Sequence, residues 1–217
     1  MIEKSVLLQL EKVAEATRTE TIQVGDIRMS PLLAKTAEEL LTYWRSGLSA
    51  MAVSSEGEVL GHAALEPLAP AWFELGAVWV REDCRGAGGY YKRVANALYR
   101  VLLAANTEKN ILATTINPAA LGLGRRIGLV PISYESLPSE IWNATCCCPA
   151  EKTGVPRGEN VPGCQLKEKL CFVRVTQETW ERLGRPQVIQ LPGLAPAHEA
   201  ETVPESHNFQ IVLSRMS

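Results

Sequence analysis

The spacing of hydrophobic residues along the chain predicts a mixture of helices and strands. Apolar residues that recur every three or four positions mark one buried side of a helix, and short apolar runs bounded by turn residues mark strands. The segment from Pro67 to Pro70 is expected to break the strand pattern. The expected helices cover 3–17, Thr36 to near Gly47, 88–105, Asn117 to near Gly128 and 176–183, and the expected strands cover 22–29, 50–54, 59–66, 72–80, 111–115, 128–132 and 170–175.

Two short segments carry more specific signals. Thr36 and Glu39 are spaced as a capping box, in which each side chain accepts a hydrogen bond from the other residue's backbone at the start of a helix. Glu56-Gly57 lies between two strand-like runs and is typical of a hairpin turn. The pattern as a whole indicates an α/β fold.

Length and composition favour one domain with a long excursion. The chain has 217 residues, of which 46% are hydrophobic, enough for a sizeable core. We assign residues 1–184 to this domain and about 133–170 to a Cys-, Pro- and Gly-rich insertion, because its length is unusual for a plain connection. Residues 185–217 are expected to form a partly extended tail that lies on the domain or on the partner subunit of a homodimer.

Charge and the N-terminal pattern exclude several classes of function. A net charge of −2 leaves no basic footprint for nucleic acid. The first residues have only a short apolar run broken by charge, so they match neither a signal peptide nor a membrane span. We therefore expect a cytoplasmic protein, in which the six cysteines are reduced, metal-bound or catalytic rather than paired in disulfides.

The most informative segment is a glycine-rich turn between the strand 72–80 and the helix 88–105. Its glycines permit positive φ and close approach of a ligand, and the first turn of a helix offers free N–H groups to an anion. Arg85 adds a cation with a planar fork suited to phosphate oxygens. The turn predicts either an anion site or a plain connection. The P-loop and dinucleotide spacings are both absent.

These residues resemble the GNAT acetyltransferase superfamily, whose loop reads Arg/Gln-x-x-Gly-x-Gly/Ala after a strand that ends in Val. Val80 ends the strand here, Arg85 and Gly88 fill the first and fourth motif positions, and Tyr90 stands at the sixth. The resemblance covers roughly residues 50–132. It implies a mixed, mostly antiparallel sheet flanked by helices, with an acyl-coenzyme A, such as acetyl-CoA, as co-substrate. The coenzyme contacts that it implies are Val78, Val80, Arg85, Gly86, Ala87, Gly88, Gly89, Tyr90 and Asn117.

The resemblance also directs attention to catalytic residues. Asn117 opens a helix, where it has a structural role as the N-cap and, by resemblance, contacts the pantetheine arm or acyl group. The family commonly has a Tyr seven residues later, as general acid to the leaving thiolate. This chain has Gly124 there. Tyr134, just past the following strand, is then the candidate replacement.

Glu74 is an ionisable residue within an otherwise apolar strand run. Partial burial favours the protonated form of a carboxyl group and makes it a better proton acceptor near neutral pH. By resemblance, Glu74 is the candidate general base. Its alternative is a solvent-facing carboxylate at a sheet edge, and Glu66 is the second candidate for the base.

The cysteines of the insertion leave several interpretations open. Cys146, Cys148, Cys164 and Cys171 offer four thiolates to a zinc ion, although their spacing is not the paired C-x-x-C of zinc ribbons. They are otherwise free buried or reactive thiols. A catalytic cysteine nucleophile is a further alternative, for which no histidine lies nearby in sequence.

The sequence therefore predicts an acyl-CoA-dependent N-acyltransferase that acts on an amine of a small molecule or peptide. The first alternative is a catalytically silent acyl-CoA-binding or regulatory module, which Gly124 favours. The second is a metal-stabilised interaction protein built on the cysteines.

Overall fold

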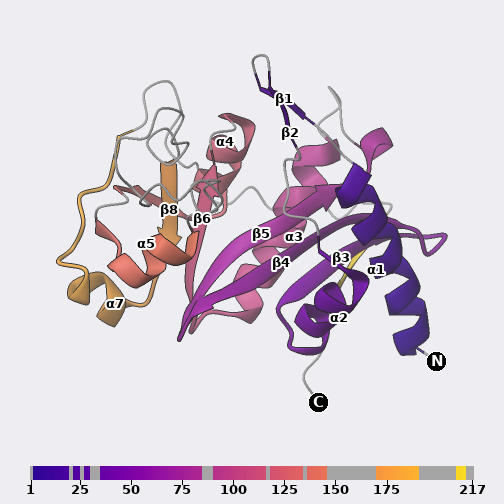
Figure 1. Ribbon diagram of the computed structural model, residues 1–217, viewed down its shortest axis with the longest axis horizontal. Helices are drawn as coiled ribbons and strands as arrows, with labels where there is room; N and C mark the ends of the chain where they lie inside the picture. The colour runs from indigo at the N-terminus through magenta and orange to yellow at the C-terminus, as the bar shows by residue number, and fades with distance from the viewer. Residues whose placement is uncertain are drawn as a thin grey trace. The chain divides into compact units, whose positions relative to one another are not determined.

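The computed structural model describes residues 2–19, 22–24, 27–29, 35–84, 90–115, 118–133, 136–145, 170–190 and 209–213 (Figure 1). The chain divides into two compact units. Unit 1 comprises Met1–Glu66, Leu75–Thr107 and Thr202–Ser217, and unit 2 comprises Pro67–Glu74 and Glu108–Glu201.

The elements follow one another as helices and strands in mixed order. The helices are α1 (Ile2–Thr19), α2 (Ala37–Arg45), the 3₁₀ turn η1 (Glu82–Cys84), α3 (Tyr90–Ala105), α4 (Pro118–Arg126), α5 (Ser139–Thr145) and α7 (Gln177–Arg182). The strands are β1 (Ile22–Val24), β2 (Ile27–Met29), β3 (Ser49–Ser54), β4 (Val59–Ala69), β5 (Trp72–Val80), β6 (Asn110–Thr115), β7 (Val130–Ile132), β8 (Leu170–Arg174) and β9 (Phe209–Leu213).

Most of the strand pairing is antiparallel. The larger sheet has the strand order β7-β8-β6-β5-β4-β3-β9. Pairs β3–β4, β3–β9, β6–β8 and β7–β8 are antiparallel, and β5–β6 is parallel. This confirms the expected mixed, mostly antiparallel α/β sheet.

Unit 1 has its own apolar core beneath α1 and α2. Helix α1 presents Val6, Leu10 and Val13 at i, i+4 and i+7, so these three side chains lie on one face. They pack with Leu40 and Leu41 of α2 and with Met51, Val59 and Trp79 of the strands. The capping box at Thr36 is confirmed, because Thr36 Oγ1 accepts from Glu39 N and Thr36 N donates to Glu39 Oε2.

Helix α3 packs very closely on β4, also within unit 1. A Cβ atom added at Gly61 would lie 2.8 Å from Val94 Cγ1, 3.2 Å from Leu98 Cδ1 and 3.1 Å from Trp79 O. Val94 and Leu98 are fully buried and belong to the stripe of apolar residues that the sequence assigns to the core. Glycine is therefore the residue that lets this helix approach the strand.

Unit 2 is built on β6, β7, β8 and the first residues of β5. Trp72, Leu112 and Val173 come from three different strands and pack with Ile141 of α5. Asn110 is buried at the beginning of β6, where its backbone N donates to Ala71 O and its Oδ1 accepts from Thr176 N just before α7. These bonds fix the beginning of β6 beside β5 and support α7.

The structure corrects four expectations about the elements. Strand β4 continues past Pro67 to Ala69, and the chain turns at Ala71, which has a positive φ of 63°. The expected strand 22–29 is two short strands, β1 and β2, paired with each other. Helix α5 was not predicted, and Phe209–Leu213, expected in an extended tail, pairs with β3 as β9. Much of the expected insertion, residues 146–169, lies outside the described residues.

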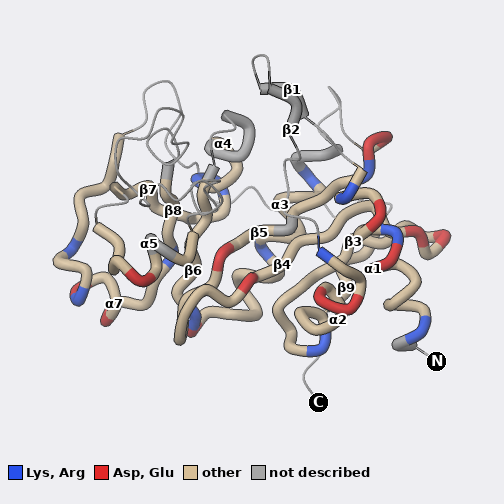
Figure 2. Tube along the Cα trace, viewed as in Figure 1, with Lys and Arg blue, Asp and Glu red and all other residues tan. Residues whose placement is uncertain are grey.

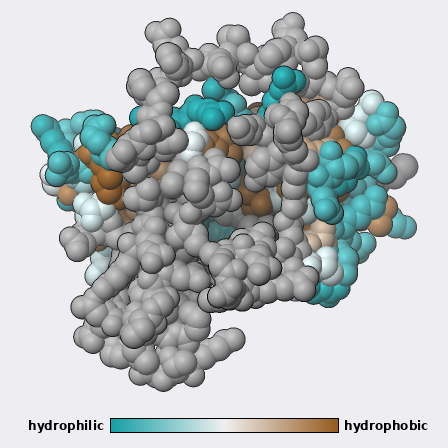
Figure 3. All heavy atoms as spheres, turned by 90° about the horizontal axis from the view of Figure 1, so that it is seen from above, coloured by the Kyte–Doolittle hydropathy of each residue, from teal (hydrophilic) through white to brown (hydrophobic). Residues whose placement is uncertain are grey.

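Charged residues of both signs are interspersed along the chain, and Figure 2 shows no continuous basic run among the described residues. On the face drawn in Figure 3, hydrophilic and hydrophobic side chains of the described residues both reach the surface. None of the described helices combines the length and apolar character that a membrane crossing requires.

Candidate functional site

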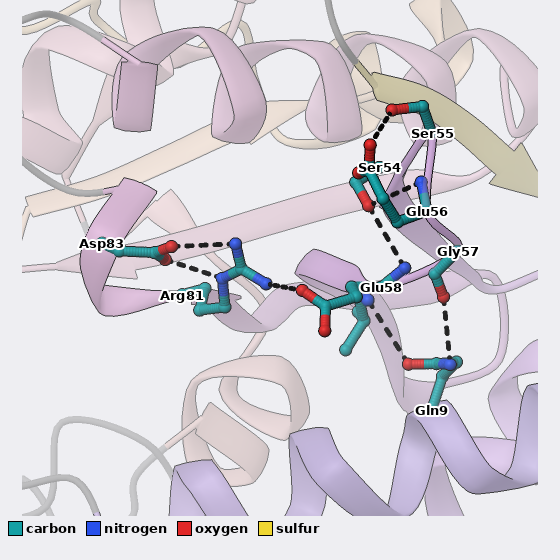
Figure 4. A network of polar contacts seen from close by, with 9 residues as sticks. Gln9, Ser54, Ser55, Glu56, Gly57, Glu58, Arg81 and Asp83 are labelled. Atoms are coloured by element: carbon teal, nitrogen blue, oxygen red, sulfur yellow. Dashed lines mark hydrogen bonds and ion pairs between the residues drawn. The ribbon is translucent and has the colours of Figure 1, made fainter.

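The end of β5 is held by a network of polar contacts in unit 1 (Figure 4). Arg81 follows the buried Val80, and its guanidinium donates from Nε and Nη2 to the Asp83 carboxylate at 2.6 and 2.8 Å. Its Nη1 donates to Glu58 Oε2 at 2.7 Å. These hydrogen bonds, led by those to Asp83, raise the pKa of Arg81 above its usual range, so the guanidinium stays charged.

The turn between β3 and β4, which carries the Glu58 partner of Arg81, is held by hydrogen bonds of its own. Ser54 Oγ accepts from the backbone N of Glu56 and of Glu58. Gln9 of α1 donates to Gly57 O at 3.1 Å and accepts from Val59 N at 3.3 Å. The predicted hairpin at Glu56-Gly57 is confirmed, and Gly57 has the positive φ of 79° that glycine adopts without strain.

The predicted glycine-rich segment comes directly after this network. Cys84 closes η1, where its backbone N donates to Arg81 O at 2.9 Å, and its side chain is buried. Arg85, Gly86, Ala87, Gly88 and Gly89 lie outside the described residues, and Tyr90 begins α3. Strand, turn and helix thus follow in the predicted order, and the first turn of α3 supplies backbone N–H groups without partners inside the helix.

Glu74 is half-buried on β5, in unit 2. Its Oε1 accepts a hydrogen bond of 3.0 Å from Thr114 Oγ1 of the neighbouring strand β6. Thr114 in turn is the register partner of Cys171 on β8. Because alternate residues of a strand share a face, Glu74, Thr114 and Cys171 lie on the face that also carries Trp72 and Leu112.

The cysteines within the described residues are buried thiols. Burial, with the charge of Glu74 adding to it, raises the pKa of Cys171 well above its usual range. Burial likewise raises the pKa of Cys84, with Asp83 adding to it. A raised thiol pKa disfavours the thiolate that nucleophilic attack requires. Of the proposed zinc ligands, Cys146, Cys148 and Cys164 lie outside the described residues, within which no cluster of three metal-binding side chains occurs.

Gly124 lies in α4 against the ring of Phe172. A Cβ atom at position 124 would be 3.3 Å from Phe172 Cδ1 and 3.6 Å from Cε1. Phe172 and Cys171 are consecutive on β8 and so point to opposite faces of the sheet. The ring of Phe172 therefore occupies the space beside Gly124, the position where the family commonly has a Tyr. This space lies on the sheet face opposite Glu74.

Glu66, the second candidate for the base, is in an ion pair. Lys35 Nζ lies 2.5 Å from Glu66 Oε2, and both side chains are largely buried, with exposed fractions of 16% and 17%. Burial opposes the charge of Lys35, but the hydrogen bond and charge of Glu66 outweigh it and raise the pKa of Lys35. Lys35 also lies 5.9 Å from the centre of the Tyr43 ring. Glu66 therefore has a cationic partner within unit 1.

The remaining predicted site residues divide into two groups. Val78 is half-buried and Val80 fully buried on β5. Asn117 and Tyr134 lie outside the described residues.

The sequence analysis did not single out Thr114 or Arg81. The alternation of residues along β6 places the Thr114 hydroxyl on a largely apolar face, and this pattern could have identified Thr114 from the sequence. No sequence pattern indicates that Arg81 pairs with Glu58 on a distant turn.

Comparisons with known proteins give structural matches alone. Family models and curated proteins provide no match. The crystal structure of Rv2747 from Mycobacterium tuberculosis in complex with CoA and NLQ matches with a TM-score of 0.47 and 18% identity, over 79% of this chain and 95% of that one. An acetyltransferase of the GNAT family from Staphylococcus aureus MU50 matches with a TM-score of 0.38 and 15% identity, over 64% and 83%. Both matches are thus similarities of structure at low sequence identity.

Proposed function

We propose that this protein is an acyl-CoA-dependent N-acyltransferase. The observation that supports this most is the order of elements in unit 1, where β5 leads through a bonded turn into the segment 85–89 and then into α3. This order presents the N–H groups of a helix start beside a glycine-rich segment, which suits the diphosphate of coenzyme A. Acetyl-CoA is the simplest donor, and a small-molecule or peptide amine is the acceptor.

In the proposed reaction the acceptor amine attacks the thioester carbonyl. The new C–N bond forms as the C–S bond breaks, the amine proton goes to Glu74 directly or through water, and the thiolate takes a proton from solvent. Backbone N–H groups of a strand stabilise the oxyanion of the intermediate. Thr114 supports this role of Glu74, because its hydroxyl donates a hydrogen bond to Oε1 of the carboxylate and so helps to orient it.

Two variants test the proposal. Arg85→Ala should raise the dissociation constant of acetyl-CoA, measured by calorimetry, without changing the melting temperature. Glu74→Gln should lower kcat at pH 7 by about 100-fold, measured as thiol release with a panel of amines, with a much smaller change in KM. Unchanged affinity in the first variant would remove the coenzyme site, and unchanged turnover in the second would remove Glu74 as the base.

A second candidate is a catalytically silent acyl-CoA-binding module. The contact of Gly124 with Phe172 favours it, because no phenol at position 124 is available to protonate a leaving thiolate. Calorimetry and thiol release separate the two functions. Acetyl-CoA binding without thiol release across the amine panel would support the silent module.

A further inference from the structure

The larger sheet has two edges, and they differ in how they are covered. At the β7 edge, Pro131 has no backbone N–H, and its O accepts a hydrogen bond of 2.9 Å from Ile189 N. Val188 adds an isolated bridge to Ile132 of the same strand. A proline and a covering segment are two of the devices by which proteins protect a sheet edge from another chain.

Strand β9 forms the opposite edge of this sheet, within unit 1. In the part of the chain that the structure describes, β3 is the only strand that pairs with it. Its sequence, FQIVL, contains neither a proline nor a charged residue. Val212 is 37% exposed, and Gln210 is exposed as well. An edge of this kind offers backbone N–H and C=O groups to a further strand.

The side chains of β9 alternate in a way that suits a second copy of the same strand. Phe209, Ile211 and Leu213 share one face of the sheet, and Gln210 and Val212 share the other. This alternation is symmetric about the central Ile211. In an antiparallel pair about a twofold axis, the Ile211 residues of the two copies lie opposite each other. Gln210 of each copy then lies opposite Val212 of the other. Ile and Val are favoured in strands and pack well across them.

We propose that two copies of this protein associate through their β9 strands into a symmetric dimer. The two outer edges pair antiparallel, so that the β3–β9 ladders of both copies join into one antiparallel stretch. The contact is isologous and occupies the outer side of β9 in both copies. Because the edge at β7 is covered, assembly ends at two copies rather than continuing into a filament. The dimer is independent of the proposed reaction.

Sedimentation equilibrium of the full chain tests the dimer directly. The wild type should pass from monomer to dimer between about 1 and 200 µM, as expected for a contact of small area. Val212→Lys should raise the dissociation constant about 10-fold, because each copy loses a cross-strand contact and gains a lysine at the edge. Leu8→Lys on α1 is the matched control, since Leu8 is 53% exposed, and it should leave the dissociation constant unchanged. Circular dichroism checks folding, and Gln210→Lys gives the same test if Val212→Lys does not fold.

Two double variants test the register of the pairing. Gln210→Glu with Val212→Lys places an introduced carboxylate opposite an introduced ammonium group at both symmetric pairs, so the dissociation constant should return to within about 3-fold of the wild-type value. Gln210→Lys with Val212→Lys places like charges opposite each other and should stay monomeric. A wild type that stays monomeric, equal dissociation in Leu8→Lys, equal behaviour of the two double variants, or species larger than a dimer would each overturn the proposal.

Discussion

The close contact of α3 with β4 makes Gly61 a sensitive position. In Gly61→Ala the new methyl group would lie 2.8 Å from Val94 Cγ1 and 3.1 Å from the backbone O of Trp79. Carbon atoms prefer separations of about 3.5–4.0 Å, so α3 has to move outward or Val94 has to leave its rotamer. Overpacking of this kind costs about 1–3 kcal/mol, and we expect about 2 kcal/mol of lost unfolding free energy.

A double-mutant cycle separates this clash from other effects. Val94→Ala removes the atom at 2.8 Å and by itself costs about 2 kcal/mol, because Val94 is fully buried. The combined variant should then lose about 1 kcal/mol less than the sum of the single variants. The measurement is urea denaturation at pH 7, followed by circular dichroism.

Gly122→Ala in α4 is the matched control, because its new Cβ would meet only Arg126 Nη2 at 3.8 Å. There alanine should be neutral or stabilising by up to about 1 kcal/mol, as expected for glycine replaced within a helix. If Gly61→Ala costs no more than this control, or if the cycle with Val94→Ala is additive, the close packing of α3 on β4 is not what limits this position.

Three further predictions concern the other contacts. Thr114→Val removes the hydroxyl that binds Glu74, so kcat for thiol release should fall about 5-fold, while Thr114→Ser keeps it; equal rates would mean that the bond does not orient the carboxylate. The raised pKa of Lys35 means that its ion pair stabilises the fold fully below its unfolded pKa of about 10.5 and loses that effect as pH rises through the higher folded value. The stability difference between wild type and Lys35→Met in urea should therefore be constant from pH 7 to 9 and shrink above about pH 10.5, and a flat difference would contradict the assignment. Gly124→Tyr should destabilise by about 2 kcal/mol without raising turnover, because Phe172 occupies the space, and faster thiol release would refute this.

Elements that depend on neighbouring residues were predictable from the sequence. The apolar stripe of α3, the capping box at Thr36 and the glycine turn at Gly57 each depend on residues within a few positions of one another. The succession of β5, a glycine-rich segment and α3 was predictable for the same reason. Glu74 was recognised as an ionisable residue in an apolar run, and the structure places it half-buried.

The pairing of distant residues was decided by the tertiary structure. Thr114 meets Glu74 across 40 residues, and Arg81 meets Glu58 across 23, because strand pairing and register bring them together. The joining of β9 to β3 and the contact of Gly124 with Phe172 likewise depend on which strands and helices pack together. Local periodicity specifies the faces that an element buries, but many partners satisfy the same face, and only the folded chain selects one of them.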